Sequence, residues 1–183
     1  MLTVPYLICI AGDLENYIKI YLSEAMISLI EAENHNTSTT AAIARLAKAI
    51  NLSKNQFSLL LACCNSDKKQ HLLSLLHEFS PIAIAELSLS ASAQTLYTTI
   101  TNALGSKEPE ALMVHGLESV VAINQLIIST NLMRDEFAKQ FQFPLVLWVN
   151  DEILRKLILL APDLKDWAAT TIRFDLPDHV LVE

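Results

Sequence analysis

Glycine is scarce in this chain of 183 residues. Only three glycines are present, and none lies between Asp13 and Leu104. A Gly-rich phosphate loop needs these residues, because only glycine lets several backbone N–H groups converge closely on a nucleotide's phosphates. The shortage argues against such a loop in the first half of the chain.

Cysteine is also scarce. The three cysteines are odd in number and two of them are adjacent, which does not suit a framework of disulfides. No Cys-x-x-Cys pair and no Cys/His ligand spacing is present, so we predict neither a structural zinc site nor any other metal site. A reducing compartment fits this usage, and we expect a cytoplasmic location.

Positive charge is the third shortage. Thirteen Lys and Arg residues stand against twenty Asp and Glu residues, which gives a net charge of −7. Proteins that bind nucleic acid rely on basic patches that displace counterions from phosphates. The one dense basic spot, Lys68-Lys69, directly follows Asp67. We therefore predict no nucleic-acid partner.

Long apolar runs are absent as well, although 52% of the residues are hydrophobic. A membrane-spanning helix needs about 20 consecutive, mostly apolar residues. The longest uncharged stretch, Leu87–Ser106, is rich in Ser and Thr, and Ser119–Met133 is shorter and contains Asn and Gln. The apolar start, Met1–Ala11, lacks the basic residues of a secretory signal. We predict no membrane partner.

Short apolar runs alternate with amphipathic stretches from residue 57 onward. Runs that are apolar throughout predict strands buried on both faces, and a strand–helix alternation predicts parallel strands joined by right-handed crossovers. The predicted strands cover residues 57–64, 82–89, 111–114, 145–149 and 171–174. The predicted helices cover residues 41–50, 68–79, 93–104, 120–140 and 153–160. The fold class is therefore α/β, with three layers and a mostly parallel sheet of about five strands.

The first 36 residues are expected to form a separate N-terminal helical segment, with residues 37–183 as the α/β domain. Apolar residues recur at helical spacing between Tyr17 and Ile30 and occupy much of the helix circumference. Such a helix needs a partner surface, either on the domain or on a second copy, so a homo-oligomer is one prediction.

Five blocks of the α/β part carry a resemblance to a known family. The blocks are residues 46–50 leading to 57–65, Val114–Glu118, Asn131–Asp135, Phe143–Val149, and Ala161–Asp163 with Trp167 and residues 172–174. With these blocks, the element order is similar to a P-loop NTPase core. It resembles in particular the NTPase-like domains that precede tetratricopeptide repeats in cyanobacterial STAND-type proteins. The resemblance implies a P-loop-like topology, in which the fourth strand lies between the first and the third, and a part in signalling or assembly.

The chain departs from this family where the family binds its nucleotide. The stretch equivalent to the phosphate loop, residues 63–71, has no glycine, and His115 follows the third strand where an active NTPase has Asp. Remnants of a nucleotide site are Lys68, Lys69, Glu118 and Asn150. The lysines either meet a phosphate or form a solvated helix face, and Glu118 is either a remnant or a first-turn residue. Asn150 is either a polar sensor or a helix N-cap, and we favour the cap.

The family also often places aromatic residues directly after its Ala-Pro-Asp. Here Leu164 and Lys165 stand there, only Trp167 remains, and Ala168 replaces an Arg. A role of this cluster in docking a neighbouring domain is therefore in question. We expect Trp167 to be a surface anchor, Trp148 to belong to the core, and Arg134 to occupy a solvated helix position.

A thiol enzyme is a further hypothesis. Cys64, His115 and Asn150 end three predicted strands, and parallel strands deliver their carboxyl ends to one edge of a sheet. These residue types are a thiol nucleophile, its base and its orienting group. The alternative is a buried cysteine, a strand-end histidine and a cap.

The favoured interpretation is a non-catalytic protein-interaction or regulatory module derived from an NTPase core. It needs no cofactor and binds a protein partner. The two rivals are a weak nucleotide-binding protein with a non-standard phosphate site, and the thiol-dependent hydrolase.

Overall fold

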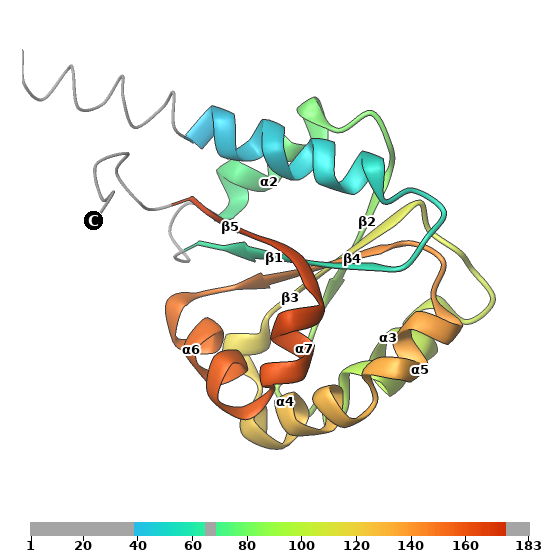
Figure 1. Ribbon diagram of the computed structural model, residues 1–183, viewed down its shortest axis with the longest axis vertical. Helices are drawn as coiled ribbons and strands as arrows, with labels where there is room; N and C mark the ends of the chain where they lie inside the picture. Colours follow the sequence, from blue (N-terminus) through green and yellow to red (C-terminus); the bar gives the residue numbers. More distant parts are fainter. Residues whose placement is uncertain (1–38, 65–68, 175–183) are drawn as a thin grey trace, which may run out of the picture. The chain divides into compact units, whose positions relative to one another are not determined.

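The computed structural model describes residues 39–64 and 69–174 (Figure 1). The predicted N-terminal helical segment and Lys68 lie outside the described residues. Five strands are present in the described part, and all of their pairings are parallel. They are β1 (Ser58–Cys63), β2 (Ile84–Ser88), β3 (Ala111–His115), β4 (Pro144–Val149) and β5 (Ala168–Arg173). The predicted α/β fold with a parallel five-stranded sheet is therefore confirmed.

The strand order is β2-β3-β4-β1-β5. Strand β4 pairs with β1 over its full length, from Ser58 opposite Pro144 to Cys63 opposite Val149, and it pairs with β3 on its other side. The fourth strand thus lies between the first and the third, as P-loop order predicts. The pairing of β1 with β5 carries one irregularity, between Leu59 and Leu60.

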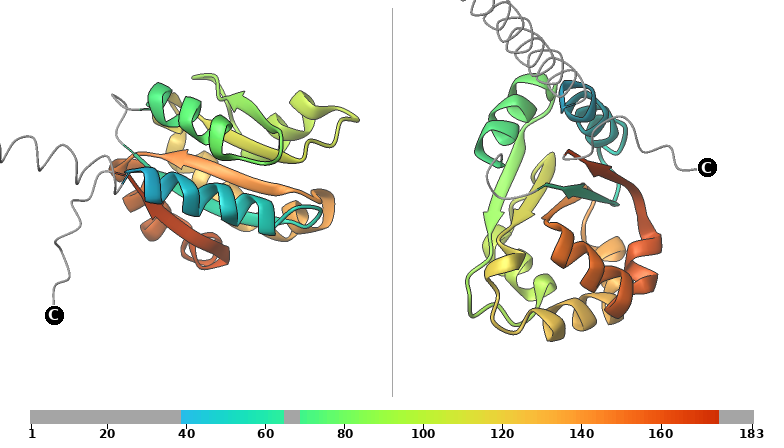
Figure 2. Two further views of the ribbon diagram at one scale, coloured as in Figure 1. Left: turned by 90° about the horizontal axis from the view of Figure 1, so that it is seen from above. Right: turned by 90° about the vertical axis from the view of Figure 1, so that its left-hand side faces the viewer.

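Helices cover both faces of the sheet. A helix over residues 39–52 and α2 (Lys69–Phe79) lie on one face (Figure 2, right-hand view). The other face carries α3 (Leu96–Leu104), the 3₁₀ helix η2 (Leu117–Ser119), α4 (Ile123–Leu132), α5 (Arg134–Gln140), α6 (Asp151–Leu160) and α7 (Pro162–Trp167). Two hydrophobic clusters, one on each side of the sheet, form the core.

Alternation along the central strands explains why the sequence is so apolar. Leu59 and Leu61 of β1 enter the cluster under α3 to α7, whereas Leu60 and Ala62 enter the cluster under α2. All six residues of β4 are buried, and Trp148 is 3% exposed and stacks on Phe174. A strand covered on both faces has no polar side, so its sequence is a continuous apolar run. Within the described residues, no helix has the length and apolar character required to cross a bilayer.

Helix α3 shows how the sequence sets its own limits. The Thr95 hydroxyl accepts a hydrogen bond from the N–H of Thr98, which satisfies one of the helix's unpaired amides. At the other end Gly105 has a φ of 56°, and its N–H donates to the carbonyl of Thr101. The predicted helix is confirmed, although it begins at Leu96 rather than at Ala93.

The single long helix predicted over residues 120–140 is wrong. The chain forms η2 and a short turn first, and the remainder is divided into α4 and α5 at Met133. The Met133 N–H closes α4 on the Ser129 carbonyl, and the Met133 carbonyl accepts the first bond of α5 from Glu136. Arg134 Nη1 donates to the Asn131 carbonyl at 2.8 Å, which satisfies one acceptor at the end of α4.

The sequence pattern predicts a helix over residues 153–160 and no helix after it, but the structure has a further helix, α7. Proline lacks an N–H and has a fixed φ, so it also suits the first turn of a new helix, and Pro162 begins α7 in this way. Leu164 then enters the core at 3% exposure. The last strand consequently begins at Ala168, three residues earlier than predicted.

Candidate functional site

The carboxyl edge of the sheet is the first candidate region, because ligands of open α/β folds bind there. Cys64 follows β1, His115 ends β3 and Asn150 follows β4. These three strands are neighbours in the order β3-β4-β1. The topology therefore brings the three predicted residues to one edge.

Two of the three take part in holding the fold together. Cys64 is 2% exposed, lies in the cluster beneath α2, and donates its backbone N–H to the Val149 carbonyl at 2.9 Å. Asn150 Oδ1 accepts the N–H of Ile153 at 2.8 Å, so Asn150 is the N-cap of α6. These positions match the structural alternatives given for both residues. The thiol-enzyme hypothesis stays a prediction.

His115 faces a carboxylate that also meets a second histidine. The Nε2 atom of His115 lies 3.6 Å from Glu86 Oε2, and the Nε2 atom of His77 lies 2.9 Å from Glu86 Oε1. Glu86 thus connects α2 to the end of β3. Burial lowers the pKa of His115 most, and the positive charge of Lys69 lowers it further, whereas Glu86 and Glu118 act in the opposite direction. Below its lowered pKa, His115 is protonated and carries a positive charge.

The four candidate residues of a nucleotide site do not all lie together in the structure. Lys69 begins α2 and Glu118 lies in η2, and the charges of both act on His115. Asn150 is engaged as a cap, and Lys68 lies outside the described residues. Across residues 39–64 and 69–174, no three His, Cys, Asp or Glu residues are arranged to hold a metal ion.

A second polar contact at this edge was missed from the sequence. Asp151 Oδ1 accepts hydrogen bonds from the Cys63 thiol, at 3.7 Å, and from Arg173 Nη2. The three residues come from α6, β1 and β5, so this contact fastens the last strand to the middle of the sheet. The only sequence signal was that Arg173 lies in one of the blocks that resemble the STAND-type family.

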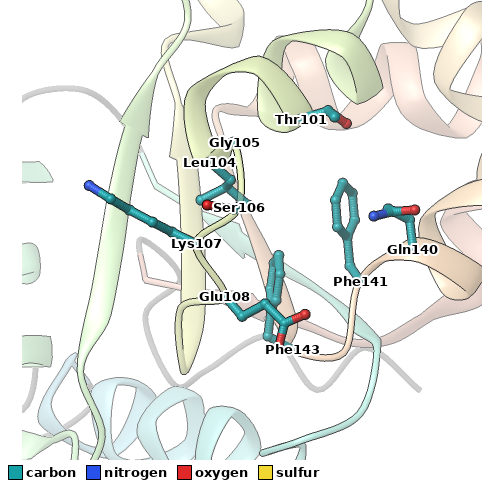
Figure 3. A pocket seen from close by; sticks show the side chains of 9 residues that line it. All are labelled: Thr101, Leu104, Gly105, Ser106, Lys107, Glu108, Gln140, Phe141 and Phe143. Carbon is teal, nitrogen blue, oxygen red and sulfur yellow. The ribbon is translucent and has the colours of Figure 1, made fainter.

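A pocket of about 160 Å³ lies at the opposite edge, beside the start of β4 (Figure 3). The side chains of Phe141, Phe143 and Glu108 are among those that line it. Pockets that enclose small molecules usually measure about 300–1,000 Å³ and occupy the carboxyl edge in this fold class. This hollow is smaller and lies at the other edge, so we do not assign it a ligand.

The second candidate region is a surface of three helices on one face of the sheet. Within the described residues, eight large hydrophobic side chains are exposed, and five of them lie on α4, α6 and α7, which pack on one another. We call these five the apolar helical face: Ile128, Leu132, Ile158, Leu159 and Trp167. Scattered exposed apolar residues are ordinary, but several on adjoining helices mark interaction surfaces.

A polar junction holds this face in shape. Asn131 Oδ1 accepts the N–H of Leu164 at 2.8 Å, so a side chain of α4 satisfies an amide in the first turn of α7. Arg134 lies 3.5 Å from Asp163 and places its guanidinium 5.8 Å from the centre of the Trp167 ring. Arg134 therefore occupies a helix position, as expected, but these contacts leave its side chain only 28% exposed rather than fully solvated.

The junction joins two of the blocks that carried the family resemblance. Asn131 and Arg134 come from one block, and Asp163 and Trp167 come from the other. Trp167 is 41% exposed, in line with its expected place at the surface. The sequence contains both blocks, and this was the only signal for the contact. The presence of both blocks does not predict that they lie in contact.

No family model and no curated protein sequence matches the chain. The relationship to P-loop and STAND-type proteins therefore stays a prediction from the sequence.

Proposed function

We propose that the chain is a non-catalytic protein-interaction or regulatory module, derived from an NTPase core, that binds another protein through the apolar helical face. The observation that carries the proposal is the gathering of five exposed hydrophobic side chains on α4, α6 and α7. A side chain such as Leu159, 77% exposed, contributes to stability only when a partner covers it.

The junction beneath this face supports the same function. Aromatic and arginine side chains are enriched among the residues that dominate binding energies. Trp167 is held beneath the guanidinium of Arg134, which is itself paired with Asp163. An aromatic ring restrained in this way loses little side-chain entropy on binding, so it suits an anchor residue. A cytoplasmic place in signalling or assembly is part of the proposal and rests on the sequence.

The test compares the intact chain with a double variant, Leu159→Glu with Trp167→Ala. Tagged forms of both are used to capture proteins from cells of the source organism, after circular dichroism has established equal folding. We expect a specific partner to be retained by the wild type and reduced at least about 10-fold by the variant, because anchor residues of this kind each contribute more than about 1 kcal/mol. Identical captured proteins would contradict the proposal.

A weak nucleotide-binding protein is the second candidate, and one observation favours it. Lys69 begins α2 at the carboxyl edge, and its charge reaches His115. A lysine beside a helix N-terminus suits phosphate. Against this, the stretch around it contains no glycine, and Glu86 and Glu118 add negative charge to the site.

Calorimetric titration with millimolar ATP, ADP and GTP plus Mg²⁺ separates the two candidates. We expect no heat of binding. Saturable binding that is lost in Lys69→Ala and kept in Lys107→Ala would favour the nucleotide function. Lys107 is a matched control, because it is a lysine at the opposite edge of the sheet.

A further inference from the structure

Two neighbouring helices of the domain carry no charge. Helices α3 and α4 contain no Asp, Glu, Lys or Arg, and they pack side by side. Every other described α-helix, including the one over residues 39–52, carries at least two such residues. The outward side of a surface helix is normally its charged side. The exposed side of α4 is therefore unusual for a surface helix, because it carries no charged residue.

The exposed residues of α4 lie on one side of the helix. They are Asn124, Gln125, Ile128 and Leu132, which are separated by intervals of three and four residues. We call Gln125, Ile128 and Leu132 the α4 stripe, and uncharged Asn124 lies beside it. Leu132 is 74% exposed and Ile128 is 43% exposed, and Val121, just before the helix, is 87% exposed. Gln125 adds a polar group without charge.

The charge of the whole chain indicates which partner this stripe fits. At a two-fold contact between identical chains, residues near the axis meet their own copies, so any charge there faces the same charge. A net charge of −7 makes such contacts unfavourable over most of the surface. A foreign partner of an acidic protein gains from charge complementarity, which an uncharged stripe cannot supply.

We infer that the α4 stripe is the two-fold contact of a homodimer, in which α4 of one chain packs on α4 of a second copy. The flanking uncharged surface of α3, with exposed Thr98 and Asn102, widens the contact without adding repulsion. This inference rests on the proposed function, because the stripe shares Ile128 and Leu132 with the apolar helical face. It assigns that part of the face to a second copy and leaves α6 and α7 to a different protein.

Sedimentation velocity of the full chain across a range of micromolar concentrations tests the inference. We expect a species of twice the 20.3 kDa of one chain. Leu132→Glu places a carboxylate in the contact and is expected to raise the dimer dissociation constant at least 10-fold. Gln125→Glu, which changes charge but hardly changes shape, is expected to raise it in the same direction.

Leu52→Glu is the matched control. Leu52 is 67% exposed against 74% for Leu132, but it lies in the helix over residues 39–52, which covers the other face of the sheet. It should leave the dimer intact. A chain that sediments as a monomer throughout, or a dimer that Leu132→Glu and Gln125→Glu leave unchanged, would overturn the inference. Neither result touches the proposed function, which fails only if the double variant on α6 and α7 captures the same proteins as the wild type.

Discussion

The side chains of the carboxyl edge have partners within the protein, whereas those of the apolar helical face are exposed. At the edge, Asn150 caps a helix, Asp151 fastens β5, and Glu86 lies between two histidines. On the helical face, Leu132 and Leu159 are largely exposed. The edge holds polar groups that already have partners, whereas the face holds apolar groups that have none within the described residues. The fold class points to the edge, whereas the binding surface that we propose is the face.

The largest effect on stability is expected at Gly116, which directly follows β3 at the carboxyl edge. Its φ is 87°, and an added Cβ would lie 3.2 Å from the Leu89 carbonyl oxygen. Gly116→Ala should therefore lower the free energy of unfolding by about 2 kcal/mol, through backbone strain and close contact. Urea denaturation measures the loss. Glu118→Ala, an exposed change two residues later, should leave the midpoint where it is, and equal effects of the two would refute the steric explanation.

The junction under the helical face should show the next largest effect. Asn131→Ala removes the acceptor for the Leu164 N–H and should cost about 1 kcal/mol, similar to the loss of the Asn150 cap in Asn150→Ala. Thermal and urea unfolding of both variants provide the comparison. Asn131→Asp keeps an acceptor oxygen and should recover most of the stability, so a loss as large as that of the alanine variant would show that the hydrogen bond is not the cause.

A smaller effect is expected from pH. Because the pKa of folded His115 is lowered, the unfolded chain binds more protons in the interval between the two pKa values. The stability due to neutral His115 is complete above the unfolded value of about 6.5 and is lost as the pH falls through the folded value. His115→Gln should flatten this slope in urea unfolding between pH 7.5 and 5. An unchanged slope would assign the pH dependence to other groups.

The smallest effects concern the charges around His115. Lys69→Met removes a positive charge and should raise the pKa of His115, whereas Glu118→Gln removes a negative charge and should lower it. Titration of the His115 ring protons by NMR measures both. Shifts of opposite sign would establish that Lys69 and Glu118 both lie close enough to act on this imidazole, and shifts of one sign would break the arrangement proposed for the edge.

The strands were predictable because burial on both faces leaves a local record, as in the unbroken apolar run of β4. The break at Met133 left none, since the buried positions Leu126, Thr130 and Phe137 keep helical spacing across it. A proline such as Pro162 is compatible with the end of one helix or with the start of the next. Only the burial of Leu164 in the core distinguishes the two. At the carboxyl edge, topology predicted that Cys64, His115 and Asn150 share one edge. The Asn131–Leu164 and Cys63–Asp151–Arg173 contacts join distant residues, so no local pattern announces them.

The position of β1 in the sheet has a consequence for how the protein is made. Among the described strands, β1 is the first along the chain, and it pairs only with β4 and β5, the last two. While the ribosome is still producing the middle of the protein, β1 is already outside it with both edges unpaired. Its Leu-Leu-Leu-Ala run is then exposed, which favours association with other nascent chains. Because these pairings join strands that are far apart in the sequence, we expect the protein to fold slowly. We also expect it to depend on chaperones during synthesis.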